Sequence, residues 1–386
     1  MKILIYCQHV LGVGHLFRTL EIAGALHNHQ VTLLLGGPPV KIAFADHIRV
    51  VQLPGLRMDA AFSSLLPTED NKTLAEVKQF RQARIFSLVK DFQPDVMVIE
   101  LFPFGRNGFS FELIPLLEAV RNGKLPSCKV VCSLRDILVE KKNPQKFEQR
   151  VIDRLNSLFD TLLVHGDPKV IPLDATFSRF DDITVPVIYT GYIAEKVNLE
   201  EAQALRKKMY LRPDEKLIVV SAGGGNVGYQ LLSAAMNAFA ELRFPARMQV
   251  FTGPYLDPDE FRSLENRDLP GASVERFADN FTSWLGAADL SVSMGGYNTT
   301  MNVLAAGTPA LVFPFNQNHE QKMRAERLSS LANLVILDEK DLAPSVFADK
   351  ITGMIRQTKK SVNIRLDGAE FTCRWLTEAV SGEPLT

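Results

Sequence analysis

The feature that most constrains the fold of this chain is a repeated alternation of short apolar runs, glycine-bearing or polar turns, and helical segments. The run KILIYCQ leads into GVGHLFRTLEIAGALHN and then into QVTLLLGG, and the later runs DVMVIE, CKVVCSLRD and DTLLVHGD end in polar residues. Such alternation is typical of right-handed βαβ units and of a mostly parallel sheet. The sequence therefore predicts an α/β protein.

A second series of the same kind follows a charged helical segment at residues 199–212. It contains KLIVVSAGGG, the helix YQLLSAAMNAFAEL, and the runs RMQVFTG, ASVERFA, ADLSVSMGG and PALVFPF. A chain of 386 residues is long enough for two domains. We expect an N-terminal Rossmann-like domain over 1–193, a C-terminal one over 194–362, and a terminal helix in 363–386 that packs back toward the N-terminal domain.

Composition excludes several classes of protein. The net charge of −1 gives no basic surface for nucleic acid. The four cysteines show no C-x-x-C or zinc spacing, which favours free thiols in a reducing compartment. The apolar run at the N-terminus is too short for a signal peptide, and no run approaches the roughly 20 residues of a membrane span. We expect a cytoplasmic protein, with peripheral contact at the inner face of the membrane left open.

Three glycine-bearing strand ends are candidate ligand sites, because ligands of open α/β sheets bind at the carboxyl ends of strands. The first is QHVLGVGHLFR, the second is SAGGGNVG at 221–228, and the third is SMGGYNTT at 293–300. Taken singly, each is also compatible with a tight or flexible turn that binds nothing.

The third stretch has the sharpest physical interpretation. Asn298 is expected to cap a helix, Thr299 and Thr300 to form its first turn, and Gly307 to follow its last residue. A helix start presents unpaired N–H groups and partial positive charge, and the two glycines before it let a bulky anion approach the backbone. This arrangement suits a phosphate or diphosphate. Asn302, four residues after Asn298, is expected to face the same way and to reach a sugar hydroxyl.

Together the three loops resemble those of GT-B glycosyltransferases and are closest in layout to family 28. The resemblance spans nearly the whole chain and is densest at 274–328. It implies two tandem Rossmann-like domains whose parallel sheets face each other across a cleft. In the family, a glycine-rich N-terminal loop with a histidine lines the acceptor side. Here that loop is GVGHLFRTLEIAGAL, with Arg18 where family members often carry proline.

The stretch VERFADNFTSWLGAADLSVSMGGYNTTMNVLAAGTPALVFPF resembles the donor half of the family in order and spacing. The resemblance implies that residues 276–278 receive the nucleotide base, that GGYNTT binds the diphosphate, and that Glu320-Gln321 contacts the donor sugar. Asn302 stands where the family usually has a glutamate that grips the ribose. The implied donor-binding residues are Gly14, Gly223, Gly224, Gly225, Asn226, Arg276, Phe277, Ala278, Gly295, Gly296, Tyr297, Asn298, Thr299, Thr300, Asn302, Glu320 and Gln321.

The implied reaction is inverting, metal-independent transfer of a sugar from a nucleotide diphosphate to an acceptor hydroxyl, with no cofactor besides the donor. A UDP-sugar such as UDP-N-acetylglucosamine is the default, and deoxythymidine or guanosine donors stay open because of Asn302. His15 is the first candidate for the general base. Glu100 and Asp136, which follow strands, could be the base or could orient His15. A histidine that serves only the core is the alternative.

The acceptor is not named by the sequence. Arg18, Arg106 and Arg135 are expected on the acceptor side, where they could hold an anionic acceptor or pair with nearby carboxylates. The N-terminal half resembles, more closely than family 28, a group of predicted bacterial glycosyltransferases through YCQHVLGVGHLFRTLEIAGAL, ELFPFGR and SLRDIL. Two other functions stay open: a nucleotide-sugar 2-epimerase, which shares the architecture, and a non-catalytic protein that binds sugar nucleotides.

Overall fold

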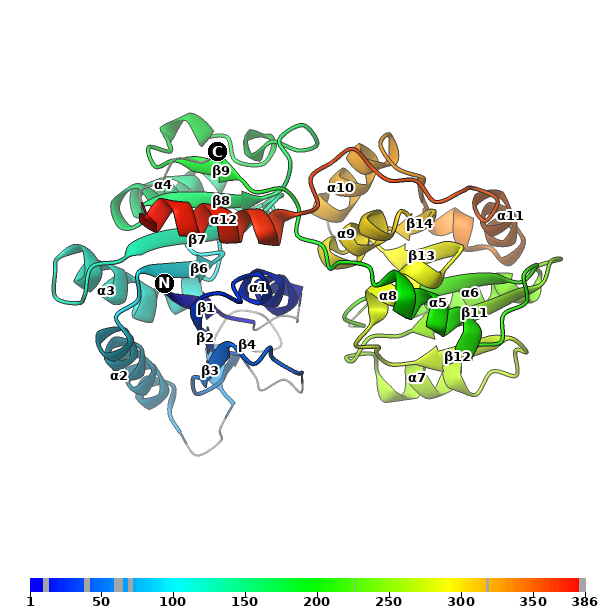
Figure 1. Cartoon of the computed structure of the whole chain (residues 1–386), viewed down its shortest axis with the longest axis horizontal. Coiled ribbons are helices and arrows are strands. Elements are labelled where there is room, and N and C mark those ends of the chain that lie inside the picture. Colours follow the sequence, from blue (N-terminus) through cyan, green and yellow to red (C-terminus); the bar gives the residue numbers. More distant parts are fainter. Residues whose placement is uncertain are drawn as a thin grey trace. The chain divides into compact units, whose positions relative to one another are not determined.

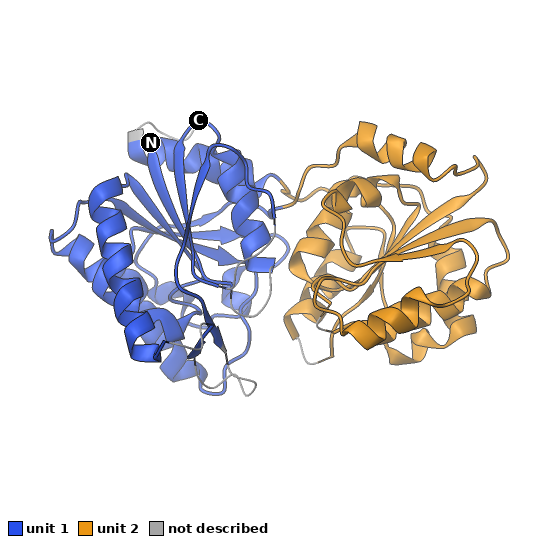
Figure 2. Ribbon diagram, turned by 90° about the horizontal axis from the view of Figure 1, so that it is seen from below, with its two compact units in different colours: residues 1–193, 367–386 blue, residues 194–366 orange. Residues whose placement is uncertain are grey.

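The computed structural model describes residues 1–9, 14–37, 42–58, 65–68, 72–225, 227–316 and 319–381. The chain forms two compact units, which Figure 2 shows in different colours. Unit 1 comprises Met1–Ile193 and Asp367–Thr386, and unit 2 comprises Ala194–Leu366. Of the predicted site residues, Asn226 lies outside the described residues.

Unit 1 is built on a parallel sheet of seven strands in the order β3-β2-β1-β6-β7-β8-β9 (Figure 1). Nearly every residue of its central strands is buried, as expected for a parallel sheet covered on both faces. A short antiparallel pair, β4 with β5, stands apart from this sheet. The strands are β1 Lys2–Cys7, β2 Gln30–Leu35, β3 Ile48–Gln52, β4 Leu56–Met58, β5 Leu65–Pro67, β6 Val96–Glu100, β7 Lys129–Arg135, β8 Thr161–His165 and β9 Val187–Tyr189.

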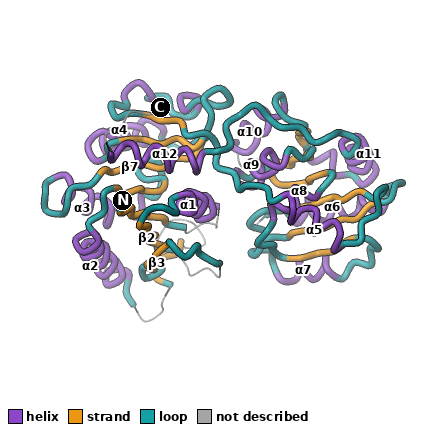
Figure 3. Tube along the Cα trace, in the orientation of Figure 1, coloured by secondary structure: helices purple, strands orange, loops and turns teal. Residues whose placement is uncertain are grey.

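Helices cover both faces of this sheet, as the purple and orange segments of Figure 3 show. Successive side chains of β1 point to opposite faces. Ile3 and Ile5 pack with α1 and α12, whereas Leu4 and Tyr6 lie in the cluster that includes α2, α3 and α4. The helices are α1 Gly14–Ala25, α2 Leu74–Phe92, α3 Ser110–Arg121, α4 Pro144–Leu158 and α12 Gly368–Ser381, with short 3-10 turns at Asn107–Phe109, Leu173–Ala175 and Phe180–Asp182.

The terminal helix α12 returns to unit 1 after the chain has built unit 2. Ile193 forms a β-bridge with Asp367, and the N–H of Gly368 donates to the carbonyl of Tyr192 over 2.9 Å. A Cβ at Gly368 would lie 2.5 Å from the oxygen of Gly191, so only glycine permits this approach. Leu376 of α12 is fully buried against the α1 side of the sheet.

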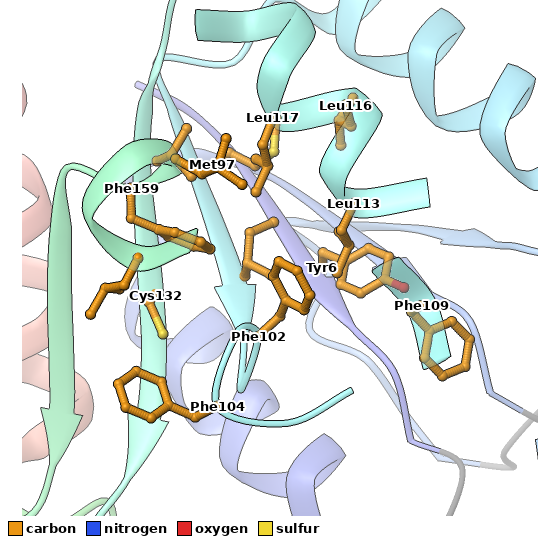
Figure 4. Close-up of a cluster of buried hydrophobic side chains, with 14 of the residues drawn as sticks. Tyr6, Met97, Phe102, Phe104, Phe109, Leu113, Leu116, Leu117, Cys132 and Phe159 are labelled. Atoms are coloured by element: carbon orange, nitrogen blue, oxygen red, sulfur yellow. The ribbon is translucent and has the colours of Figure 1, made fainter. Parts of the chain in front are cut away.

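The larger core cluster of unit 1 reaches the loop that follows β6 (Figure 4). Phe102 and Phe104 are 0% and 2% exposed. Their rings lie 6.4 Å from the ring of Phe159 and 5.3 Å from that of Phe177, respectively. Aromatic packing therefore fixes the loop between Glu100 and the 3-10 turn at 107–109.

Unit 2 has a parallel sheet of six strands in the order β12-β11-β10-β13-β14-β15. The predicted α/β fold with two tandem Rossmann-like domains is confirmed. The strands are β10 Lys216–Ser221, β11 Ala246–Phe251, β12 Ala272–Glu275, β13 Leu290–Met294, β14 Ala310–Phe313 and β15 Leu334–Ile336. The helices are α5 Leu199–Lys208, α6 Tyr229–Ala240, α7 Pro258–Glu265, α8 Phe281–Ala287, α9 Tyr297–Ala306, α10 His319–Ser329 and α11 Pro344–Met354, with a 3-10 turn at Glu339–Leu342.

No helix in the described part of the chain is both long enough and apolar enough to cross a membrane.

A buried ion pair ties α2 to α3 on one face of the unit 1 sheet. Arg81 donates from Nε and Nη2 to the two carboxylate oxygens of Glu112 over 2.8 and 2.6 Å, and both side chains are fully buried. Arg81 also donates to the carbonyls of Gly36 and Pro54, and Tyr6 donates its hydroxyl to Glu112. This network holds the loops that follow β2 and β3.

We predict that Glu112→Leu destabilises unit 1 by about 3–5 kcal/mol, because it leaves the Arg81 guanidinium buried without its carboxylate. Urea unfolding measures the loss. The double variant Arg81→Met/Glu112→Leu removes both charges and is expected to lose less than the single variant. A double variant that is less stable than Glu112→Leu would contradict this account of the ion pair.

Candidate functional site

In both sheets the chain first adds strands on one side of the first strand and later adds strands on its other side. β1 lies between β2 and β6, and β10 lies between β11 and β13. At such a switch point the adjacent strands are followed by connections to opposite faces of the sheet, and ligands of α/β proteins bind there. Ligands are therefore expected at the loops after β1 and β6 in unit 1 and after β10 and β13 in unit 2.

In unit 1 the switch point brings together His15 and Glu100, which we call the dyad. His15 is the second residue of α1, directly after Gly14, and Glu100 is the last residue of β6. His15 Nδ1 lies 2.5 Å from Glu100 Oε1, and Arg18, one helical turn further on, donates from Nη2 to the same oxygen over 2.7 Å. Sequence reasoning named all three residues, but not their convergence on one carboxylate oxygen.

The charges around the dyad fix the tautomer of His15. Burial alone would raise the pKa of Glu100, but His15, Arg106 and Arg18 outweigh it and lower that pKa to about 2. An ionised carboxylate only accepts hydrogen bonds, so His15 Nδ1 carries the proton and Nε2 keeps its lone pair. Burial, with Arg106 and Arg18, lowers the pKa of His15 to about 4 against the opposing effect of Glu100. At neutral pH His15 is a neutral imidazole.

The other predicted acceptor-side residues lie at the same ends of β6 and β7. Arg106 follows β6, and its Nε is 3.7 Å from Glu100 Oε2. Arg135 is the last residue of β7 and is half-buried. Asp136 is fully buried, and its Oδ1 accepts the N–H of Ile137 over 2.9 Å. Of the two carboxylates proposed to orient His15, the described contacts place Glu100 in that position.

A second buried histidine, His165, lies at the end of β8 and was not singled out from the sequence. Its Nδ1 is 2.9 Å from Thr190 Oγ1, which itself donates to the carbonyl of Gly191. His165 Nδ1 is therefore the donor, and Nε2 accepts from Ser133 Oγ at 2.7 Å. Burial, together with Arg18, lowers the pKa of His165 to about 3, with Glu100 opposing.

In unit 2, glycines bring the loops after β10, β11 and β13 together. A Cβ at Gly223, which has φ +66°, would lie 3.7 Å from Thr299 Oγ1, so the loop after β10 borders the start of α9. A Cβ at Gly253 would lie 2.4 Å from the carbonyl oxygen of Gly223. Cβ positions on Gly224 and Gly296 would meet no described atom within 4 Å, so both glycines face open space.

The helix α9 starts directly after Gly295 and Gly296, which we call the glycine pair. Its first internal hydrogen bond runs from the N–H of Thr300 to the carbonyl of Gly296 over 3.0 Å, so the N–H groups of residues 297–299 have no acceptor within the helix. The prediction that Asn298 caps the helix is wrong. Gly296 takes the extended N-cap conformation, and within the described residues no side chain caps it. Gly307, with φ 64°, follows the last helical residue as predicted.

Asn302 uses its amide within unit 2. Its Oδ1 accepts the N–H of Glu195 over 3.1 Å, and its Nδ2 donates to Thr282 Oγ1 over 3.2 Å. Thr282 in turn donates its hydroxyl to the carboxylate of Glu195. One N–H and one lone pair of the Asn302 amide remain for a further contact.

The predicted base-binding loop, residues 276–278, connects β12 to α8. Arg276 Nη1 donates to the carbonyl of Leu256 over 3.0 Å, and its guanidinium lies 4.2 Å from the centre of the Phe261 ring. Phe277 is 44% exposed, and Ala278 is half-buried. Arg276 therefore packs toward α7, whereas Phe277 is among the exposed residues of this loop.

Two residues of α10, Gln321 and Arg324, approach Gly295 of the glycine pair. Glu320 is buried, and Gln321 Oε1 accepts the N–H of Phe315 over 3.0 Å. Arg324, which sequence reasoning missed, is 1% exposed and lies 5.3 Å from the ring centre of Tyr297. Arg324 lies four residues after Glu320 and three after Gln321. Residues with this spacing share a helix face, so the sequence held a signal that Arg324 lies near the predicted pair.

Comparisons with known proteins cover most of the chain. An uncharacterized glycosyltransferase from Methanosarcina mazei is 22% identical over 84% of this chain and 82% of its own length. The UDP-N-acetylglucosamine–N-acetylmuramyl-(pentapeptide) pyrophosphoryl-undecaprenol N-acetylglucosamine transferase of Acetivibrio thermocellus is 22% identical over 75% of this chain and 72% of its own length. The structure of the spinosyn rhamnosyltransferase SpnG with thymidine diphosphate aligns with a TM-score of 0.56 at 18% identity, covering 100% of this chain and 97% of that one.

The decisive match is local. Residues 221–366 match the glycosyltransferase family 28 C-terminal domain. The chain has the GT-B fold, and this segment is similar to that of family 28. The matched segment begins at the last residue of β10 and contains the glycine loop after β10, the glycine pair, α9 and α10.

We predict that His165 makes unit 1 less stable in acid. Unfolded, it binds a proton below its ordinary pKa of 6.5, but folded it does so only near pH 3. The free energy of unfolding therefore falls as pH falls through this window, by about 1.4 kcal/mol per pH unit for one histidine. His165→Gln removes the titrating group.

Urea unfolding between pH 6.5 and about 5 tests this. Glu100 loses its contribution to the free energy of unfolding only at lower pH, because its pKa is lowered from 4.5 to about 2. The slope of stability against pH should be smaller by about one proton in His165→Gln. His27→Gln, at an exposed position, should keep the wild-type slope. An unchanged slope in His165→Gln would show that His165 titrates normally in the folded chain.

Proposed function

We propose that this chain transfers a sugar from a nucleotide diphosphate to an acceptor hydroxyl, with inversion and without a metal ion. The observation that carries the proposal is the uncapped start of α9 beside Gly223, inside the segment that matches the family 28 C-terminal domain. The relatives and structure described above are named as glycosyltransferases rather than as epimerases, which favours transfer over the alternative.

The start of α9 supplies the diphosphate site. The N–H groups of its first turn and the positive end of the helix dipole both favour an oxyanion. Gly296 has no side chain to obstruct the approach, and Thr299 adds a hydroxyl beside the loop after β10. Arg324, buried behind Tyr297, contributes a full positive charge close to this turn. These groups would stabilise the charge that develops on the leaving diphosphate.

The dyad supplies the base. His15 Nε2 takes the proton of the acceptor hydroxyl while that oxygen attacks the anomeric carbon from the face opposite the diphosphate. The bond from the anomeric carbon to the diphosphate oxygen breaks, and its electron pair leaves with the nucleotide. Glu100 accepts the hydrogen bond from Nδ1–H, so the lone pair of neutral His15 lies on Nε2, and the carboxylate stabilises the imidazolium that forms. Inversion follows from a single displacement.

The donor is proposed to be a UDP-sugar, with UDP-N-acetylglucosamine as the default. The Acetivibrio thermocellus relative is named for this donor, whereas SpnG was solved with thymidine diphosphate. Both nucleotides therefore belong in any binding test. The proposed base contact is the loop at 276–278, in which Phe277 is 44% exposed. Glu320 and Gln321 are proposed to face the donor sugar.

We predict that Gly296→Val weakens nucleotide-diphosphate binding and leaves the fold intact. Gly296 has φ −65°, which any residue adopts, and its Cβ position is open, so valine fits the protein but occupies the space proposed for the diphosphate. Calorimetry with UDP and dTDP should show at least about a tenfold loss, which corresponds to roughly 1.4 kcal/mol.

Gly353→Val is the matched control, because its Cβ also meets no described atom within 4 Å but it lies in α11. This variant should bind as the wild type does. If Gly296→Val binds the same nucleotide with unchanged affinity, the diphosphate does not lie at the start of α9.

We predict that His15→Ala lowers kcat by about 10²–10⁴-fold without weakening donor binding, since a positioned general base contributes on that order. In the wild type, kcat/KM should not fall as pH drops through 6.5, because burial and the two arginines lower the pKa of His15 to about 4. Steady-state kinetics between about pH 5 and pH 8 measure both effects. His27→Ala is the control, and normal turnover of His15→Ala would assign the base elsewhere.

A further inference from the structure

Arg106 is a buried cation whose hydrogen-bonding capacity the protein leaves partly unused. Its side chain is 7% exposed. Within the described residues, neither its Nε nor its Nη2 has a hydrogen-bond partner. The nearest carboxylate oxygen, Glu100 Oε2, is 3.7 Å from Nε, which is too long for a hydrogen bond. Buried arginines are normally satisfied, so this one calls for a ligand.

The hydrogen bonds around Glu100 show which kind of ligand is missing. Its Oε1 is occupied by His15 and Arg18, while its Oε2 has no hydrogen-bond partner among the described residues. Nε and Nη2 of Arg106 together carry three N–H donors, so unpaired donors outnumber the single unpaired acceptor atom. Two guanidinium groups, those of Arg18 and Arg106, face one carboxylate, and His15 is neutral at pH 7. The surplus of donors and of positive charge favours an anion over a neutral hydroxyl.

The loop that carries Arg106 holds it firmly in this position. Phe102 and Phe104 are buried in the core on one side of it (Figure 4). Arg106 has φ 57° and Leu101 has φ 65°, a left-handed conformation that residues other than glycine rarely adopt. A strained backbone maintained by core packing is typical of positions where the side chain has a functional placement.

We propose that Arg106 binds an oxyanion, a phosphate or carboxylate group that the acceptor carries close to its reacting hydroxyl. Nε and Nη2 form one edge of the guanidinium, which matches two oxygens of such a group. Arg106 and His15 lie beside the two oxygens of the same carboxylate, Glu100. The anionic group and the hydroxyl that they are proposed to contact therefore lie near each other on the acceptor. The inference rests on the proposed function and adds the chemical class of the acceptor.

Calorimetry on the full chain with saturating UDP or dTDP tests this, because the nucleotide occupies the donor site. Inorganic phosphate, acetate and glucose are then titrated separately. Phosphate or acetate should bind, glucose should not, and Arg106→Gln should weaken the anion by about tenfold or more. Arg106→Lys keeps the charge but not the paired donors and should lose less. The preference between phosphate and acetate tells a phosphorylated acceptor from a carboxylated one.

Arg84→Gln, an exposed arginine of the same unit, is the matched control and should bind as the wild type. Nucleotide binding by Arg106→Gln shows that this variant is folded. Failure of the wild type to bind any nucleotide diphosphate would defeat the proposed function itself. With nucleotide bound, no anion site in the wild type, equal anion affinity in Arg106→Gln, or equal binding of glucose would each overturn the Arg106 assignment alone.

Discussion

The buried carboxylate of Glu100 is the group on which the site in unit 1 depends. At 1% exposure it would be strongly destabilising unless charged donors surrounded it. His15 and Arg18 come from α1, so the ion pairs also fix the start of that helix against the end of β6. The same carboxylate selects the tautomer of His15. One electrostatic requirement thus sets both the local structure and the chemistry that His15 can perform.

Unit 2 uses the same topological position in a different chemical way. Its switch point has no buried carboxylate with converging cations among the described contacts. Instead, glycines in three loops let backbone segments approach each other closely, and the start of α9 is left without a side-chain cap. Backbone N–H groups bind an oxyanion without selecting what lies beyond it, whereas the side chains of unit 1 can accept a proton. In the function that we propose, this difference suits one unit to a diphosphate and the other to a hydroxyl.

Local features of the sequence predicted the elements well, but not the partners of the polar side chains. Alternating apolar runs and turns predict the strands, and Gly307 ends α9 as expected because its φ is a local property. The helix α9 starts earlier than predicted because Gly296, rather than Asn298, serves as its N-cap without a side-chain hydrogen bond. The contacts of Asn302 depend on residues far away in sequence, so no local pattern could reveal them. The spacing of Arg324 after Glu320 and Gln321 indicates a shared helix face but not its packing against Tyr297.

Position 302 shows how far such contacts change the interpretation of a sequence difference. An amide can accept the N–H of Glu195 with its oxygen and donate to Thr282 with its nitrogen. A glutamate in its place could accept but not donate, and its carboxylate would adjoin that of Glu195, whose pKa burial already raises. Asparagine is therefore explained by the internal structure of unit 2. The difference from the usual glutamate does not by itself argue that this chain uses a different nucleotide.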